Sequence, residues 1–341
     1  MSEVLQPILG RVATGATLTA EQTEAAFDLL MQGAATPTQI GGLLMALRVR
    51  GETVDEIVGA VRAMRAHMVP VAAPDGVIDT CGTGGDGAHT FNISTAVAFV
   101  VAGCGVLVAK HCNRAMSSRS GGADVLEALG VNIETPFEDA GRIIAEGGVG
   151  FLFAPRHHGA MKHVGPSRRE LGTRTLFNLL GPLSNPAGAR RQLLGVFARH
   201  WLVPVAEVLR TLGSERAWVV HGSDGLDELT TTTHSHVAEL RNGVVTCFDV
   251  APEDAGLPRA SPDSLRGGNA RDNAAALRVM LSGKHGPYRD IVVLNAAAAL
   301  VVAGRADTLV RGAELARGSI DSGAAAARLD SLVCATNRVN A

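Results

Sequence analysis

The sequence reads Asp79-Thr-Cys-Gly-Thr-Gly-Gly-Asp-Gly-Ala-His-Thr-Phe-Asn-Ile-Ser-Thr95 between a predicted strand, 77–80, and a predicted helix, 94–102. Glycine lets backbone N–H groups approach an anion closely, and this loop is rich in glycine. Its last four residues bring short polar side chains to the helix N-terminus, where the helix dipole also favours anions. The loop therefore predicts a phosphate site, with a well-capped turn as the structural alternative.

The glycines at 82–87 also satisfy the GxGxxG pattern of dinucleotide-binding folds. They do not open the helix, however, because the predicted helix begins well after the last of them. The next predicted strand, 106–109, is followed by Lys110 instead of the acid expected to bind a ribose hydroxyl. Lys110 and Arg114 would suit the extra phosphate of NADP, so an NADP site stays open as an alternative.

A second polar loop, 110–124, also leaves a strand and enters a helix, with three basic residues and no acid before Asp124. Adjacent parallel strands end at one edge of a sheet, where open α/β sheets bind ligands. Two such loops predict a ligand with two separated phosphate groups. Within this loop, Cys112 lies beside His111 and Arg114, which could lower the thiol pKa, but the sequence shows no clear Ser-His-Asp or Cys-His constellation and a nucleophilic role is disfavoured.

Two further segments carry charge. The basic island 155–174 holds five Lys or Arg residues against one acid, without the interleaved aromatic residues of an RNA-binding surface. An anionic substrate needs only one of these arginines, held as a fork on a carboxylate. The acidic loop 221–228 contains adjacent Asp227 and Glu228, which would repel a phosphate unless a cation such as Mg²⁺ lay between them. Exposed acids in a turn are the alternative.

The fold class is predicted as α/β, with a small N-terminal helical domain and a larger domain around a mostly parallel sheet. Capping boxes begin at Thr19, Thr36 and Thr53 in the first 70 residues. Strands and helices then alternate, which is typical of parallel sheets, and the last 70 residues return to alanine-rich helix. The predicted strands are 77–80, 106–109, 149–153, 193–197, 218–221 and an antiparallel hairpin, 236–241 and 244–248, joined by Asn242-Gly243.

These patterns predict two domains. Residues 1–70 form the helical domain, joined by the helical segment 166–185, and residues 71–341 form the α/β domain. The chain has 341 residues with 31 basic and 33 acidic side chains, and a net charge of -2 disfavours binding of nucleic acid by the whole surface. No apolar run reaches the roughly 18 residues of a membrane span, and no secretion signal is seen. Five scattered cysteines without a CxxC pair indicate a reducing cytoplasm.

The sequence strongly resembles the anthranilate phosphoribosyltransferase family over nearly its whole length. Five motifs agree with the family in order and spacing, including D-T-x-G-T-G-G-D and V-H-G-x-D-G-L-D-E. They lie at Asp79–Asp86, Phe91–Thr95, Lys110–Gly121, Arg168–Pro186 and Val220–Glu228. Three positions depart from the family: Cys112 stands for Gly, Gly122 for a small hydroxyl residue, and Gly159 for Pro.

The resemblance implies transfer of a 5-phosphoribosyl group from phosphoribosyl pyrophosphate to the amine of anthranilate. The products are N-(5-phosphoribosyl)anthranilate and pyrophosphate, in tryptophan biosynthesis. The family is typically homodimeric through the small helical domain, and a cytoplasmic location is expected. The transition state should resemble an oxocarbenium ion, without a covalent intermediate, and no residue is assigned as general acid or base.

The resemblance also implies residue roles. Anthranilate would contact Gly82, Asn113 and Arg168, with Arg168 on its carboxylate. Two Mg²⁺ ions would be served by Ser94, Asp227 and Glu228. Phosphoribosyl pyrophosphate would be bound by Gly82, Gly85, Asp86, Thr90, Asn92, Ile93, Ser94, Thr95, Lys110, Asn113, Ser117, Ser118 and Gly122.

Two other functions stay open. A pyrimidine nucleoside phosphorylase shares the helical-plus-α/β architecture but uses inorganic phosphate, and the adjacent Asp227 and Glu228 disfavour it. A nucleic-acid-binding relative of the same fold would show salt-dependent binding of DNA or RNA, which the near-neutral net charge disfavours. No membrane partner is expected.

Overall fold

The computed structural model describes residues 4–115 and 119–338. Its centre is a seven-stranded sheet with the order β3-β2-β1-β4-β5-β6-β7. The first five strands in sequence run parallel, and β6 and β7 are antiparallel, which confirms the predicted sheet and hairpin. The strands are β1 Ile78–Gly82, β2 Val108–Cys112, β3 Val149–Phe153, β4 Arg191–Gly195, β5 Arg216–Gly222, β6 Ser235–Arg241 and β7 Val244–Val250.

Helices cover both faces of this sheet. The first four helices are α1 Leu5–Ala13, α2 Ala20–Met31, α3 Pro37–Arg50 and α4 Val54–Ala66. The others are α5 Ile93–Gly103, α6 Gly122–Ala128, α7 Phe137–Gly147, α8 Ala154–His157, α9 Gly165–Leu171, α10 Phe177–Leu183, α11 Leu202–Thr211, α12 Ala270–Leu281, α13 Pro287–Val302, α14 Leu309–Asp321 and α15 Ala324–Arg338. Short 3₁₀ helices lie at Gly159–His163, Arg199–Trp201, Pro252–Ala255 and Pro262–Leu265.

The N-terminal helices begin where the capping boxes predict. The hydroxyls of Thr19, Thr36 and Thr53 each accept a backbone N–H bond from the third residue of the following helix. The third box does more than cap, because the buried carboxylate of Glu56 also accepts the N–H of Leu18 at 2.9 Å and pairs with an arginine. Glu56 of the third capping box thus also connects α4 to the segment before α2 and to the end of α3.

The segment 166–185 returns to this helical bundle. Helix α9 contacts α3 and α10 contacts α4, and the ring centres of Phe177 and of Phe27 on α2 lie 5.4 Å apart. The guanidinium of Arg65 donates to the carbonyl of Leu183 at 2.7 and 3.0 Å. We therefore propose that 166–185 belongs with residues 1–70, with the remainder of 71–341 forming the α/β domain.

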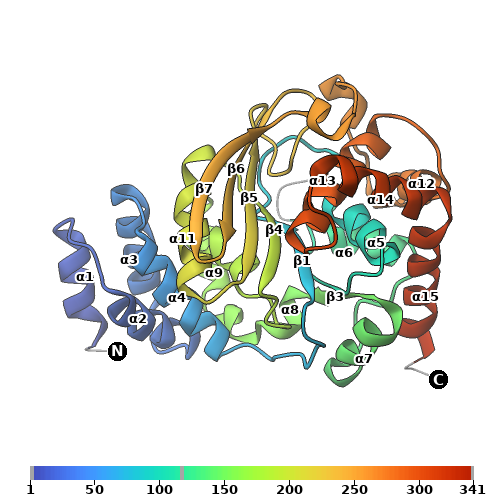
Figure 1. Ribbon diagram of the computed structural model, residues 1–341. Coiled ribbons are helices and arrows are strands. Elements are labelled where there is room, and N and C mark those ends of the chain that lie inside the picture. Colours follow the sequence, from blue (N-terminus) through green and yellow to red (C-terminus); the bar gives the residue numbers. More distant parts are fainter. Residues whose placement is uncertain (1–3, 116–118, 339–341) are drawn as a thin grey trace.

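The other face of the sheet carries the alanine-rich C-terminal part (Figure 1). Helix α5 is buried along almost its whole length and packs against α13, α15 and strand β1. Within α13, Ala296–Leu300 have no exposed surface, so small side chains allow close approach of α14. In the part of the chain that the structure describes, no helix has both the length and the apolar character needed to cross a membrane.

One strand lies later in the sequence than predicted. The sequence predicts a strand at 106–109, whereas β2 spans Val108–Cys112 and is buried throughout. The prediction stopped at Lys110 because a charged residue normally ends a buried strand. Here the ammonium of Lys110 donates to the carbonyl of Thr80 on the neighbouring strand, and the N–H of His111 donates to Asp79 at 3.1 Å. Polar partners on β1 therefore let the strand continue.

Candidate functional site

The glycine-rich loop after β1 meets the acidic loop after β5 at the carboxyl edge of the parallel strands. The N–H of Gly84 donates to Oδ2 of Asp227 at 2.6 Å. The N–H of Thr83 donates to the carbonyl of Gly195, the last residue of β4, at 2.9 Å. Gly84 and Gly85 have φ values of 66° and 77°, a conformation that L side chains rarely adopt. The structure thus brings together two loops that lie about 140 residues apart in sequence.

Three carboxylates crowd this point: Asp86, Asp227 and Glu228. Burial, followed by repulsion from Asp86, raises the pKa of Asp227 to about 7. Burial, followed by repulsion from Asp227, raises the pKa of Glu228 to about 8. Both side chains keep some contact with solvent but lie deep among protein atoms. Burial and mutual repulsion therefore disfavour the ionised forms of both carboxyl groups.

Ser94, at the start of α5, also reaches this cluster, because its hydroxyl bonds to the carboxylate of Glu228. Carboxylate and hydroxyl oxygens are the hard ligands that Mg²⁺ prefers, and a divalent cation would relieve the repulsion. The donor set of Ser94, Asp227 and Glu228 therefore fits magnesium, and the structure places the three predicted ligands together.

Lys110 lies inside β2 and not in the loop that follows it. It is 4% exposed, and its ammonium donates to the carbonyl of Thr80. Its positive charge also favours the ionised forms of Asp79 and Glu228. The prediction that Lys110 stands in a polar loop is wrong, because the partners that hold it in the strand come from another strand. Its contact with a phosphate stays a prediction.

The second loop carries less free positive charge than its sequence predicts. Arg114 pairs with Asp124 at 3.0 Å and with Glu127 at 2.5 Å. Asn113 is exposed, and its side-chain oxygen accepts the N–H of Arg114 at 2.8 Å. Ser117 and Ser118 lie outside the described residues, so their predicted phosphate contacts stay predictions.

The N-terminus of α5 is built as predicted, but some of its side chains are committed to protein partners. The amide of Asn92 donates to the carbonyl of Ser120 at 3.2 Å and accepts from Asn273 at 2.9 Å. Ile93 and Thr95 are buried. Thr90 pairs as a β-bridge with Arg266, which ties the glycine-rich loop to the C-terminal half. Backbone N–H groups and Ser94 are thus the groups best placed for an anion.

Arg168 lies on α9, at the helical side of the molecule. Its guanidinium stands 5.1 Å from the ring centre of Phe177, and burial lowers its pKa. Within residues 4–115 and 119–338, no described contact joins Arg168 to Gly82 or Asn113. The structure therefore does not bring the three residues predicted to bind anthranilate into contact. Arg168 has no acidic partner among its described contacts and is free to bind a carboxylate.

Two domains of one sequence family match the chain, the first in its helical N-terminal part and the second in its α/β part. The helical bundle domain of the glycosyl transferase family matches residues 6–68, and its a/b domain matches residues 74–326. Anthranilate phosphoribosyltransferase of Rhodopseudomonas palustris (strain TIE-1) is 63% identical over 326 residues, which cover 96% of each chain. That of Azorhizobium caulinodans is 60% identical over 334 residues, 98% of this chain and 97% of its own. The chain belongs to the anthranilate phosphoribosyltransferase family.

Solved structures of the anthranilate phosphoribosyltransferase family share the whole fold. The Thermus thermophilus enzyme matches with a TM-score of 0.92 and 45% identity, covering 96% of this chain and 99% of its own. The Saccharomyces cerevisiae enzyme in complex with PRPP and Mg matches with a TM-score of 0.91 and 27% identity, covering 99% of both chains. The predicted fold class is therefore confirmed.

Two departures from the anthranilate phosphoribosyltransferase family motifs lie side by side. A methyl group at Gly122 would stand 3.7 Å from Cβ of Cys112 and 3.1 Å from the hydroxyl of Thr95. The missing side chain at Gly122 thus gives room beside Cys112. Burial raises the pKa of Cys112 to about 12, which agrees with the expectation that this thiol is not a nucleophile.

The family motifs did not reveal the contacts of two residues, Arg174 and Asn295, whose side chains bond to the backbone of the glycine-rich loop and of the segment that follows the acidic loop. Arg174 lies in the basic island, and its guanidinium donates to the carbonyl of Gly85 and stacks 4.4 Å from the centre of the Phe197 ring. Asn295 of α13 is fully buried, accepts the N–H of Leu229 at 3.0 Å and donates to the carbonyl of Leu229 at 2.8 Å. A lone amide in an apolar helix was the available signal for Asn295.

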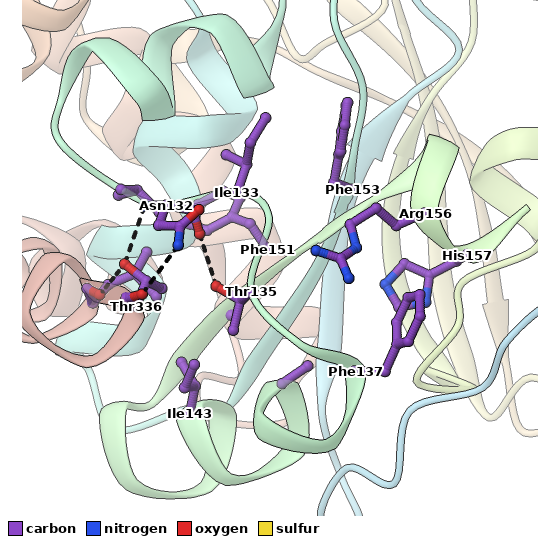
Figure 2. Close-up of a pocket in the computed structure, with 14 residues that line it drawn as sticks. Asn132, Ile133, Thr135, Phe137, Ile143, Phe151, Phe153, Arg156, His157 and Thr336 are labelled. Atoms are coloured by element: carbon purple, nitrogen blue, oxygen red, sulfur yellow. Dashed lines mark hydrogen bonds between the residues drawn. The ribbon is translucent and has the colours of Figure 1, made fainter. Parts of the chain in front are cut away.

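A separate pocket lies between α7, β3 and α15, away from these loops (Figure 2). Phe137, Arg156 and His157 line one side, and Asn132 on the other side donates its N–H to Thr336 at 3.2 Å. The pocket is not lined by any residue predicted to bind substrate or metal in the anthranilate phosphoribosyltransferase family. The candidate site therefore rests on the converging loops and not on this pocket.

Two buried histidines near the site make stability depend on pH. Burial lowers the pKa of His111 from 6.5 to about 3 and that of His158 to about 4. The unfolded chain binds these protons near pH 6.5, so the stabilisation is complete above that pH and lost as pH falls toward 4. We expect the free energy of unfolding to fall by up to about 1.4 kcal/mol per pH unit for each histidine, as measured by urea denaturation.

His158→Gln should flatten this slope, because one of the two groups no longer binds a proton on unfolding. His285→Gln is the matched control, since His285 is exposed and should leave the slope unchanged. An equal slope in the wild type and His158→Gln would contradict the prediction.

Proposed function

We propose that the chain transfers the 5-phosphoribosyl group from phosphoribosyl pyrophosphate to the amine of anthranilate, giving N-(5-phosphoribosyl)anthranilate and pyrophosphate in tryptophan biosynthesis. The observation that carries the proposal is the contact between the glycine-rich loop and the carboxylate pair, seen in the 2.6 Å bond from Gly84 to Asp227. It sets anion-binding N–H groups directly beside ligands for a cation. The names of the relatives support the same reaction.

The phosphates would bind to backbone N–H groups of the glycine-rich loop and of the α5 N-terminus. Glycine lets backbone N–H groups approach an anion closely, and the helix dipole favours an anion at the α5 N-terminus. Ser94 adds a hydroxyl at the same place. Contacts of phosphoribosyl pyrophosphate with Asn113, Ser117, Ser118 and Gly122 belong to this proposal as well.

Magnesium would be held by Asp227, Glu228 and Ser94, and two ions are proposed. When bound, Mg²⁺ would neutralise negative charge on the pyrophosphate leaving group. The relative from Saccharomyces cerevisiae was solved in complex with PRPP and Mg, which supports magnesium use here.

The chain's own contribution to the reaction is positioning and electrostatics. The amine of anthranilate is a weak nucleophile, so the bond from ribose C1 to pyrophosphate breaks ahead of attack through an oxocarbenium-like state. Arg168 would orient anthranilate through its carboxylate, and the loop N–H groups would hold the phosphates still. This mechanism requires no covalent intermediate, which agrees with the raised pKa of Cys112.

The direct test follows anthranilate fluorescence. It should fall when phosphoribosyl pyrophosphate and MgCl₂ are added together, and EDTA should stop the change. Folded protein that gives no turnover would refute the proposal. Phosphorolysis of thymidine or uridine, or a salt-sensitive gel shift with DNA or RNA, would instead favour one of the two alternatives.

Arg168→Ala should raise the KM for anthranilate about 10- to 100-fold, because an arginine fork on a carboxylate contributes about 1.5–3 kcal/mol. The KM for phosphoribosyl pyrophosphate should change little. Steady-state kinetics with each substrate varied in turn measures both. Arg169→Ala is the matched control, because Arg169 is the exposed neighbour on the same helix. Equal losses for both substrates would contradict the assigned role of Arg168.

We further propose a homodimer formed through the small helical domain, and a cytoplasmic location. Val49 at the end of α3 is 81% exposed, which is unusual for a large apolar side chain and supports an interface there. The five cysteines are free thiols, in keeping with a reducing compartment. Light scattering of the purified chain tests the dimer, and Val49→Glu should weaken it.

A further inference from the structure

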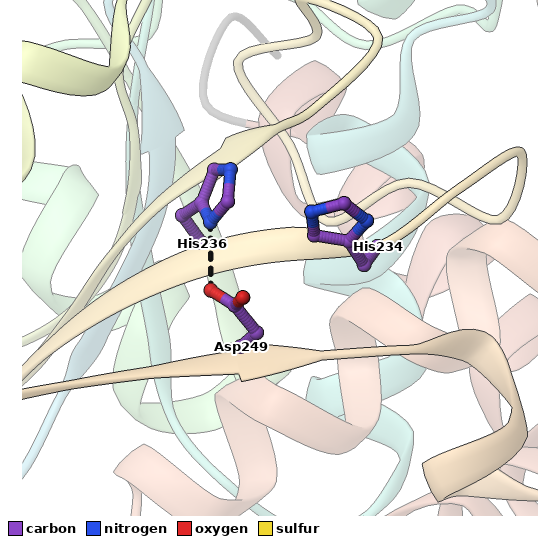
Figure 3. A group of neighbouring side chains, drawn as sticks. All are labelled: His234, His236 and Asp249. Carbon is purple, nitrogen blue, oxygen red and sulfur yellow. Dashed lines mark hydrogen bonds and ion pairs between the residues drawn. The ribbon is translucent and has the colours of Figure 1, made fainter.

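Two histidines and an aspartate gather at one end of the β6–β7 hairpin, apart from the magnesium ligands (Figure 3). His236 lies on β6, and His234 lies one residue before the strand begins, with its ring next to that of His236. Asp249 of β7 is the direct cross-strand partner of His236. One ligand atom from each of the three side chains lies within 4.8 Å of the other two.

His236 is already oriented as a metal ligand would be. Its side chain is 11% exposed, with Nδ1 2.6 Å from Oδ1 of Asp249 and Nε2 3.0 Å from the hydroxyl of Ser223. Histidines that bind metals usually bond their second nitrogen to an oxygen, which sets the tautomer. The serine hydroxyl both donates and accepts, so Ser223 can accept from Nε2 and leave the Nδ1 lone pair for a cation.

His234 and Asp249 complete the set from the exposed side. The ring of His234 lies 5.0 Å from that of His236 at 84°, and its Nδ1 is 3.4 Å from the hydroxyl of Thr233. Asp249 is 60% exposed, so its carboxylate has room to move. Ligands around a tetrahedral zinc ion stand about 3.3 Å apart, so ligand atoms that now lie up to 4.8 Å apart would move closer together when an ion binds.

We propose that His234, His236 and Asp249 form a binding site for a borderline divalent cation of the zinc class, distinct from the magnesium site. Imidazole nitrogen selects such metals over Mg²⁺, which prefers oxygen ligands. Two histidines and one carboxylate leave a further coordination position for water. Ser223 lies in the same loop as Asp227, so a bound ion would also brace that loop.

The test uses the full-length chain without an affinity tag, stripped with EDTA, dialysed and kept in excess MgCl₂ so that oxygen sites are filled. Titration with ZnCl₂ in a calorimeter should show one saturable equivalent per chain. His234→Ala and, separately, Asp249→Asn should each weaken zinc affinity at least 10-fold. Co²⁺ should give visible absorption bands of a low-coordinate site in the wild type and lose them in both variants.

His285→Ala is the matched control, because it removes an exposed histidine elsewhere and should bind zinc like the wild type. Circular dichroism and magnesium-dependent turnover should be unchanged in His234→Ala, which separates this site from the proposed catalytic function. Absence of saturable zinc binding, or equal affinity in the wild type, His234→Ala and Asp249→Asn, would overturn the proposal.

Discussion

Asp227→Asn combined with Glu228→Gln should lower kcat/KM by about a thousandfold while raising the melting temperature of the metal-free protein. Activity falls because the variant loses both carboxylate ligands, and losses of this size accompany removal of preorganised charge at a reacting phosphate. Stability rises because three crowded carboxylates repel one another and the amide replacements keep their shape and hydrogen bonds. Anthranilate fluorescence against MgCl₂ concentration, and thermal unfolding in EDTA, measure the two effects.

The matched control is Asp224→Asn in the same loop. Asp224 accepts hydrogen bonds from the hydroxyls of Thr230 and Thr232 at 2.6 and 2.5 Å, an arrangement that an amide oxygen can keep. The activity of Asp224→Asn and its response to magnesium should stay within about threefold of the wild type, because Asp224 is not one of the predicted metal ligands. Normal magnesium activation of the double variant would contradict the metal site at Asp227 and Glu228.

Among the Gly→Ala substitutions, Gly195→Ala should be the most damaging, because its added methyl group would make the closest contact with other atoms. The new Cβ would overlap the carbonyl oxygen of Asp227, and backbone at that place cannot move without shifting the acidic loop. Overpacking of this kind costs about 3 kcal/mol of unfolding free energy. The shift would also misplace the carboxylates, so we expect activity to fall at least about 100-fold. Urea denaturation and magnesium titration measure both losses.

Gly159→Ala is the control for this change, because the added methyl group would meet open space at an exposed position. Its unfolding free energy and activity should match the wild type. Wild-type magnesium activation in Gly195→Ala would show that the acidic loop does not depend on this close approach.

Local sequence signals predicted much of the architecture. The capping boxes at Thr19, Thr36 and Thr53 each start a helix, and Asn242-Gly243 joins the two antiparallel strands. Each of these signals works because the interacting groups lie within a few residues of one another. The strand-loop-helix alternation predicted the parallel sheet for a similar reason, since each unit repeats the same short-range pattern.

The chemical environment of the charged residues needed contacts between distant parts of the chain. Arg114 belongs to a loop whose basic residues suggest phosphate binding, yet Glu127, 13 positions further on, pairs with it. Lys110 was read as a loop residue, yet a carbonyl 30 positions earlier holds it in a buried strand. Neither partner is adjacent in sequence, so neither pairing could be inferred from spacing.

The residue types and their order were enough to predict the α/β class, which the structure confirms, and they also predict two phosphate-type loops and a cation beside Asp227 and Glu228. Only the folded chain decided which charges are free, because packing brings Gly84 and Asp86 against Asp227. The reason is physical: electrostatic energies and pKa values depend on distance and burial, which are properties of tertiary structure, whereas helix caps, turns and alternation depend on neighbours along the chain.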